Sequence, residues 1–130
     1  MKMEDRYLFK AKDCNSIWRA GLLIALREDR CAIEEKDGSK WACDSKTICQ
    51  CTGLKDKNGK LIWENDIVKC LYNYYGRKGV YVGKVIYKED TCCFVVTTSG
   101  NTDYEWREEE KEVIGNAFDS KELLESEGII

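Results

Sequence analysis

Short runs of β-branched and aromatic residues alternate along the chain with polar turns, and this pattern is clearest between residues 52 and 68. Asn58-Gly59 lies between two β-favouring runs, and both residues tolerate the positive φ that a tight hairpin requires. A second polar reversal, at residues 64–66, precedes another β-favouring run at residues 67–72. The pattern predicts a hairpin, a second reversal and a strand, around which the rest of the chain is organised.

The first half of the chain is typical of short strands. Residues 6–11 form a β-favouring run, and Asp37-Gly38 predicts a hairpin turn between two further short runs. Residues 17–26 are long enough for a helix, but they lack a 3.6-residue period and their opening is a poor helix start. One or two strands are favoured there, with a helix as the alternative. Asp44 and Ser45 are suited to cap a single helical turn.

The second half contains the clearest long strand, residues 80–87, in which Gly83 predicts a bulge or a sharp bend. Polar and aromatic residues 73–79 predict a loop before it. The remaining expected elements are a turn at 88–91, a strand at 92–98, a loop at 99–103, a brief pairing at 104–106, a last strand at 113–118, and a short helix that Asp119 caps and Glu127-Gly128 ends.

Several short strands at regular spacing are typical of a small barrel or sandwich. We expect a mainly β fold in which residues 53–118 form a small, partly open SH3-like barrel. Residues 1–52 are expected to form a second, N-terminal β subdomain, and residues 119–130 a short C-terminal helix and tail.

Composition supports a folded protein. Hydrophobic residues make up 43% of the 130 residues and charged residues 35%, which is ordinary for a soluble globular domain. The longest apolar run, residues 20–26, is too short to span a bilayer, and the first six residues do not resemble a secretory signal. A cytoplasmic location is therefore expected. In that compartment the eight cysteines should be free thiols rather than disulfides.

Charge is unevenly distributed. Residues 53–88 contain eight basic and three acidic side chains, whereas residues 89–130 contain three basic and twelve acidic ones. A basic middle and an acidic end suggest either intramolecular pairing or head-to-tail contact between copies of the chain. The alternative is two solvated faces that never meet, because exposed ion pairs contribute little.

Neither the cysteines nor the carboxylates indicate a reactive centre. Cys49 and Cys51 lie too close in sequence for the usual zinc pair, and the chain has no histidine. Packing is favoured over a zinc site or a labile disulfide. Asp56 and Asp66 are well explained as turn residues that accept backbone hydrogen bonds. We therefore expect no catalytic residue, no metal and no cofactor.

A basic and aromatic stretch at residues 69–84 is the best candidate for a binding surface. Such a mixture can form a platform for single-stranded nucleic acid, although the sequence pI of about 5.2 opposes phosphate binding. Aromatic residues are also enriched at protein interfaces, so protein binding, most simply self-association, is the leading hypothesis. The candidate residues are Lys69, Tyr72, Tyr74, Tyr75, Arg77, Lys78, Tyr81 and Lys84.

The stretch from Thr52 to Val68 resembles the YopX protein family of bacteriophages and prophages. The family pattern T-G-L-x-D-x-N-G-x-x-I-x-x-x-D-x-V is matched by Thr52, Gly53, Leu54, Asp56, Asn58, Gly59, Ile62, Asp66 and Val68. A closing V-I-G-N element is matched by Val113, Ile114, Gly115 and Asn116, and Phe9-Lys10-Ala11 resembles the usual start more weakly.

Three positions depart from the family pattern. Asn65 lies where glycine is typical, and Cys49 and Cys51 replace the common glycine and tyrosine. Asparagine can also adopt a left-handed conformation, so the turn is still expected. The resemblance implies a phage or prophage origin and an accessory role inside the host bacterium. It implies no assigned enzymatic function, and a host or phage protein becomes a candidate partner beside a second copy of the chain.

Overall fold

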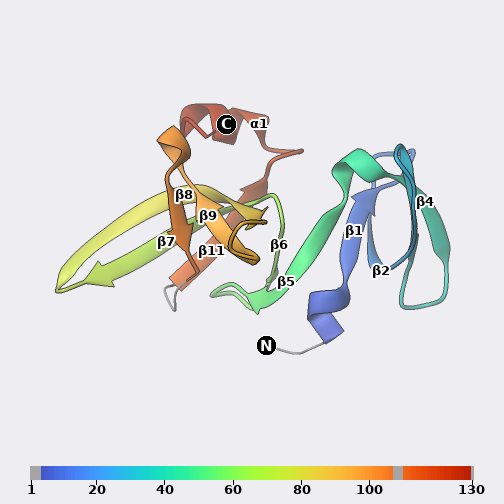
Figure 1. Ribbon diagram of the computed structural model, residues 1–130, viewed down its shortest axis with the longest axis horizontal. Helices are drawn as coiled ribbons and strands as arrows, with labels where there is room; N and C mark the ends of the chain where they lie inside the picture. The colour runs from blue at the N-terminus through green and yellow to red at the C-terminus, as the bar shows by residue number, and fades with distance from the viewer. Residues whose placement is uncertain (1–3, 107–109, 130) are drawn as a thin grey trace. The chain divides into compact units, whose positions relative to one another are not determined.

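The computed structural model describes residues 4–106 and 110–129, without the side chains of residues 4 and 101. Residues 1–3, 107–109 and 130, which include part of the acidic stretch, therefore lie outside the described residues. The chain divides into two compact units, Met1–Leu54 and Lys55–Ile130. Both consist mainly of antiparallel strands, so the predicted mainly β class is confirmed (Figure 1).

The first unit is built on an antiparallel sheet in the order β4-β3-β2-β1-β5. Its core contains Ala11, Cys31, Ile33 and Cys43. Residues 18–26 form a strand, as favoured over a helix, and Asp44 caps the single helical turn by accepting from the Lys46 backbone N–H. The elements are η1 (Glu4–Tyr7), β1 (Phe9–Lys12), β2 (Trp18–Leu26), β3 (Arg30–Glu34), β4 (Lys40–Asp44), η2 (Ser45–Thr47) and β5 (Cys49–Lys55).

The second unit begins at the predicted asparagine-glycine turn, which the structure confirms. The Asp56 N–H donates to the Lys60 carbonyl at 2.7 Å, and Gly59 has a φ of 79°. Asn58 does not have the positive φ expected of both residues, so the turn is present in another form. A five-stranded antiparallel sheet follows in the order β10-β9-β8-β7-β11. The elements are β6 (Leu61–Trp63), β7 (Asp66–Tyr74), β8 (Arg77–Lys88), β9 (Cys93–Thr97), η3 (Ser99–Asn101), β10 (Asp103–Glu105), β11 (Glu110–Asn116) and α1 (Lys121–Ser126).

Three local predictions in the second unit are wrong. Residues 73–79 are not a loop, because β7 and β8 continue through them and are joined by two residues only. Gly83 forms no bulge, since the strand register is continuous there. Its missing Cβ instead makes room for the Thr97 carbonyl, which would lie 2.6 Å away. Ser120, not Asp119, is the N-cap residue of α1, and no side chain caps that helix.

The core of the second unit contains Ile62, Val68, Cys70, Val85 and Val96. Among the described strands neither sheet closes on itself, so the expected SH3-like barrel stays a prediction. No helix in the described part of the chain is long and apolar enough to span a membrane. The long β7–β8 hairpin extends beyond the rest of its sheet (Figure 1), and most of the candidate binding residues lie on this hairpin.

Candidate functional site

The end of the β7–β8 hairpin is formed by Tyr75 and Gly76. Their φ angles are 51° and 78°, so both adopt the left-handed conformation that a two-residue hairpin turn requires. Gly76 does so without strain, whereas a bulky side chain at positive φ is unusual. Tyr75 is also 90% exposed. The chain therefore has an aromatic residue at this exposed turn despite an unfavourable backbone conformation.

The strand register sorts the candidate residues onto two faces of the hairpin. Residues directly opposite each other in an antiparallel pair share a face. Cys70 lies opposite Tyr81, and Tyr72 opposite Gly79, so these tyrosines lie on the face that continues from the buried core. By the alternation of the strand, Tyr74 and Arg77, which form the next such pair, also lie on this face. Lys69, Lys78 and Lys84 lie on the opposite face, although Lys78, next to the tip, also borders the hollow described below.

The tyrosines border an open hollow, which we call the tyrosine groove. Tyr81 stacks on Tyr104 of β10 with 4.4 Å between ring centroids, and Tyr72 lies 6.1 Å from Tyr81. The groove has a volume of about 950 Å³. Its lining residues are Leu71, Tyr72, Asn73, Tyr74, Lys78, Gly79, Val80, Tyr81, Tyr104, Glu105 and Glu110. The sequence prediction missed Tyr104, whose proximity to Tyr81 depends on the path of the chain between β8 and β10.

Gly79 holds Tyr72 in place within the groove. A Cβ atom at Gly79 would overlap the ring of Tyr72, so the ring lies directly across the glycine backbone. An aromatic ring that covers a cross-strand glycine is a known way to compensate for the missing side chain in a sheet. Although 40% exposed, Tyr72 is therefore held in one place rather than free to turn into solvent.

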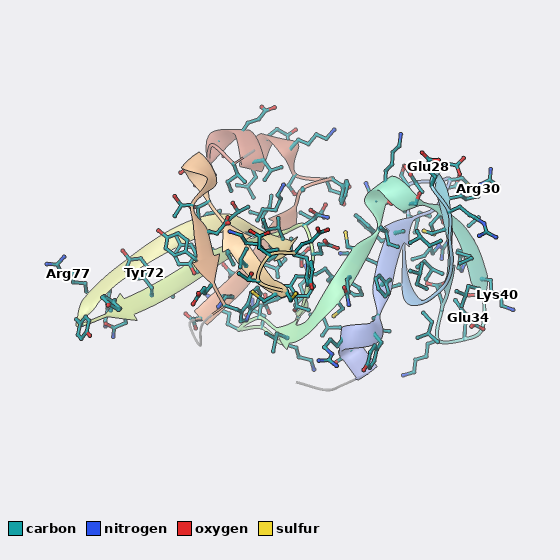
Figure 2. The ribbon with its side chains drawn as sticks, in the orientation of Figure 1. Glu28, Arg30, Glu34, Lys40, Tyr72 and Arg77 are labelled. Atoms are coloured by element: carbon teal, nitrogen blue, oxygen red, sulfur yellow. The ribbon has the colours of Figure 1, made fainter. Side chains whose placement is uncertain are left out.

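The groove has charges of opposite sign at its two ends. Arg77 lies at the far end of the hairpin, and Tyr72 part-way along it (Figure 2). Lys78 follows Arg77, whereas Glu105 lies opposite Val95 and Glu110 opposite Leu71, both nearer the body of the unit. Within residues 4–106 and 110–129, none of these four charged side chains forms an ion pair.

The family-motif residues form a structural network rather than part of the groove. The carboxylate of Asp56, only 8% exposed, accepts backbone N–H bonds from Asn58 and Lys60, each at 2.9 Å, and from Val113 at 3.0 Å. Burial raises the pKa of Asp56, but the hydrogen bonds from Val113, Lys60 and Asn58 outweigh it and hold that pKa below its ordinary value. Asp56 thus fastens the turn to β11.

Other motif residues support neighbouring turns. Asp66 accepts from the Trp63 N–H at 2.8 Å, and Asn65 has the expected left-handed conformation, with a φ of 71°. Asn116 accepts from the N–H groups of Phe118 and Asp119. A Cβ at Gly115 would lie 2.5 Å from the Ser120 hydroxyl oxygen, so glycine permits this close approach. In the first unit, Gly53 of β5 has a φ of 80°.

The first unit contains a polar cluster that the sequence did not predict. The carboxylate of Asp13 accepts from the Arg19 Nε at 2.9 Å and from the N–H groups of Asn15 and Ile17. The hydrogen bond from Arg19 is the main reason that the pKa of Asp13 lies below its ordinary value. Arg19 in turn lies 3.5 Å from the centroid of Trp41. Each charged group in this cluster has a partner, so the cluster is best explained as structural.

The cysteines are free thiols, and five of the eight are buried. Burial raises the pKa of Cys31, and it raises the pKa of Cys43 to about 11. Such thiols are poor nucleophiles and poor metal ligands because both roles need the thiolate. In the described part of the chain, no three cysteine or acidic side chains are grouped closely enough to hold a metal ion.

The chain matches the model of a known protein family. The family model described as YopX protein matches residues 5–125, nearly the whole chain. A search of curated proteins found no match.

Proposed function

Because the chain belongs to the YopX family, we propose that it is a phage- or prophage-encoded accessory protein that acts by binding protein and catalyses no reaction. The proposed partner is another copy of the chain or a host or phage protein, met in the cytoplasm of the bacterial host. The proposed binding surface is the tyrosine groove. The observation that supports it most is the series Tyr72, Tyr81 and Tyr104 beside an open hollow of about 950 Å³.

Tyrosines suit protein recognition because each offers a large contact area and loses little conformational freedom on binding. Here that loss is reduced further, since Tyr72 is already held over Gly79 and Tyr81 is stacked on Tyr104. Aromatic anchors of this kind supply much of the binding energy at protein interfaces. The groove therefore has the composition and the rigidity of a protein-binding surface.

The topology of the second unit supports a further part of the proposal, that residues 53–118 form a partly open SH3-like barrel. The consecutive strands β7, β8, β9 and β10 lie side by side, and β11 returns to pair with β7, the first of them. A small sheet in which the last strand returns to the first is suited to closure into a barrel.

Single-stranded nucleic acid is the second candidate partner. The ring faces of the groove tyrosines could stack on bases, and Arg77 could contact phosphate. Glu105 and Glu110 oppose this interpretation because they place negative charge at the groove. Lys69 and Lys84, which would strengthen phosphate binding, lie on the other face of the hairpin. The charges therefore favour protein over nucleic acid.

The test compares the wild-type chain with the double variant Tyr72→Ser/Tyr104→Ser. Each chain is used as bait in extracts of prophage-carrying bacteria, captured proteins are identified by mass spectrometry, and the affinity of each purified partner is measured by calorimetry. We expect the double variant to bind at least tenfold more weakly. Tyr87→Ser is the matched control, because Tyr87 is 43% exposed and does not line the groove.

Equal affinity of the wild type and the double variant for every partner would contradict the proposal. A parallel titration of labelled single-stranded DNA at low salt separates the two candidate functions. Flat anisotropy removes nucleic acid as the partner, whereas saturable binding that the double variant loses would replace protein with nucleic acid.

A further inference from the structure

We infer that the tyrosine groove binds the tyrosine groove of a second copy of this chain, with the two hairpins antiparallel. This inference rests on the proposed function and adds the identity and orientation of the partner. In the paired arrangement, the hairpin tip of each copy lies at the acidic end of the other copy's groove.

The charges on the groove are complementary under this arrangement. Arg77 and Lys78 follow the tip directly, and Lys78 lines the groove there, whereas Glu105 and Glu110 line it nearer the body of the unit. A twofold axis between two grooves places the basic tip of each copy against the acidic end of its partner, so the same contact forms twice. A parallel arrangement would instead place like charges together, which is costly at an interface.

These charged groups are available for such a contact. Within the described residues, Arg77, Lys78, Glu105 and Glu110 have no ion-pair partner in their own chain. Two ion pairs elsewhere in this unit are already formed, Lys57 with Glu112 at 3.5 Å and Lys88 with Asp103 at 2.7 Å. Charged side chains of both signs are therefore available along the same groove.

The apolar part of the groove fits the same partner. Between the charged ends lie Tyr72 and Tyr104, which are 40% and 43% exposed. Mutual burial of two such surfaces removes apolar area from water in both copies, which is the main favourable contribution to association. Tyr75, at the tip, would reach the far end of the partner's groove. Strained backbone held at an exposed position is a common feature of functional sites, so this contact explains why an aromatic residue occupies that turn.

The test uses charge reversal at each end of the groove. The tip variant is Arg77→Glu/Lys78→Glu, and the base variant is Glu105→Lys/Glu110→Lys. Analytical ultracentrifugation over a concentration series measures the mass of each. The wild type is expected to change from the 15.0 kDa monomer to twice that mass. Each variant alone is expected to dimerise at least tenfold more weakly, because both of its tip-to-base contacts become repulsive.

Mixing the two variants provides the decisive comparison. In a heterodimer of tip and base variants both contacts become attractive again, so dimerisation is expected to return. The chain with all four reversals should also dimerise with itself. Lys36→Glu/Lys121→Glu is the control, because it reverses two exposed lysines outside the groove and gives the same charge change as the tip variant. Circular dichroism establishes that every variant is folded.

A wild type that stays monomeric over the whole series would overturn this inference. So would a dimer that is insensitive to both reversals, or a mixture in which dimerisation does not return. Each of these results would leave the proposed function intact if captured proteins still bind through Tyr72 and Tyr104. If no partner depends on those tyrosines, the proposed function fails as well.

Discussion

Replacing Asp56 by asparagine is expected to lower the free energy of unfolding of the second unit at pH 7. The carboxylate accepts three backbone N–H bonds, two within the turn and one from Val113 in β11. The amide oxygen of asparagine can keep the two bonds within the turn, both of which go to Oδ1 of Asp56. The amide nitrogen then faces the Val113 N–H, so two donors meet and one hydrogen bond is lost.

The size of the effect follows from the bonds that are lost. A hydrogen bond to a charged group contributes about 1.5–3 kcal/mol, so asparagine should cost about 2 kcal/mol. Alanine loses all three bonds, but Asn58 and Lys60 are exposed and their N–H groups can bind water instead. Val113 is only partly exposed, so its N–H group is less able to replace the lost hydrogen bond with one to water. We therefore expect alanine to lower the free energy of unfolding by about 4 kcal/mol. Stability of whole domains is about 5–15 kcal/mol, which makes either change easy to detect.

The dependence on pH gives a second check. The pKa of Asp56 is lowered by folding, so its contribution to stability is complete above its unfolded pKa of about 4. That contribution is lost as the pH falls from there through the folded pKa. The difference between wild type and Asp56→Asn should therefore be constant between pH 7 and pH 5 and should decrease toward pH 2.

The assay is urea unfolding followed by pulsed hydrogen exchange, in which peptides from β7 and β11 report on the second unit alone. Asp90→Asn is the matched control, because Asp90 is also a turn aspartate in this unit but is exposed. A cost below about 0.5 kcal/mol, or a cost that does not decrease at low pH, would refute the reasoning, since a charge-assisted bond should contribute more.

Two further predictions concern the hairpin and the thiols. Tyr75→Asn is expected to raise the free energy of unfolding by about 1 kcal/mol, because asparagine tolerates positive φ better than tyrosine. If urea unfolding gave a free energy below that of the wild type, the inferred strain at the Tyr75 φ of 51° would be wrong. In native protein three thiols, those of Cys14, Cys92 and Cys93, should react rapidly with a colorimetric thiol reagent, and all eight should react in urea. More than three rapid thiols, or fewer than eight in urea, would contradict the described burial and the absence of disulfides.

The elements predicted best were those set by local turn chemistry. Asn58-Gly59 and Asp37-Gly38 are sequences that favour positive φ by themselves, so each hairpin could be placed from a few residues. In the structure both Tyr75 and Gly76 have a positive φ, but tyrosine is rarely found in that conformation, so the turn was missed and a loop was predicted. Because a loop was predicted at residues 73–79, the strand alternation that places Tyr72 and Lys78 on opposite faces of the hairpin could not be followed through it.

The rest of the candidate site depends on contacts between distant parts of the chain. Tyr72 and Tyr81 were named from their aromatic character, but the stacking of Tyr81 on Tyr104 could not be predicted without the path of the chain. Asp56 was predicted to open a turn, yet its bond to Val113 joins residues 57 positions apart. No local pattern contains that information, because the pairing of β11 with β7 is decided by packing of the whole second unit.

That long-range bond has a consequence for synthesis of the protein on the ribosome. The hairpins around Asn58 and Tyr75 can form as soon as their own residues leave the exit tunnel, because their contacts are local. The Asp56 carboxylate must wait for Val113, which is made 57 residues later. A nascent chain that lacks β11 would therefore leave β7 as an unprotected sheet edge, the part of a β protein most prone to pair with a neighbouring chain.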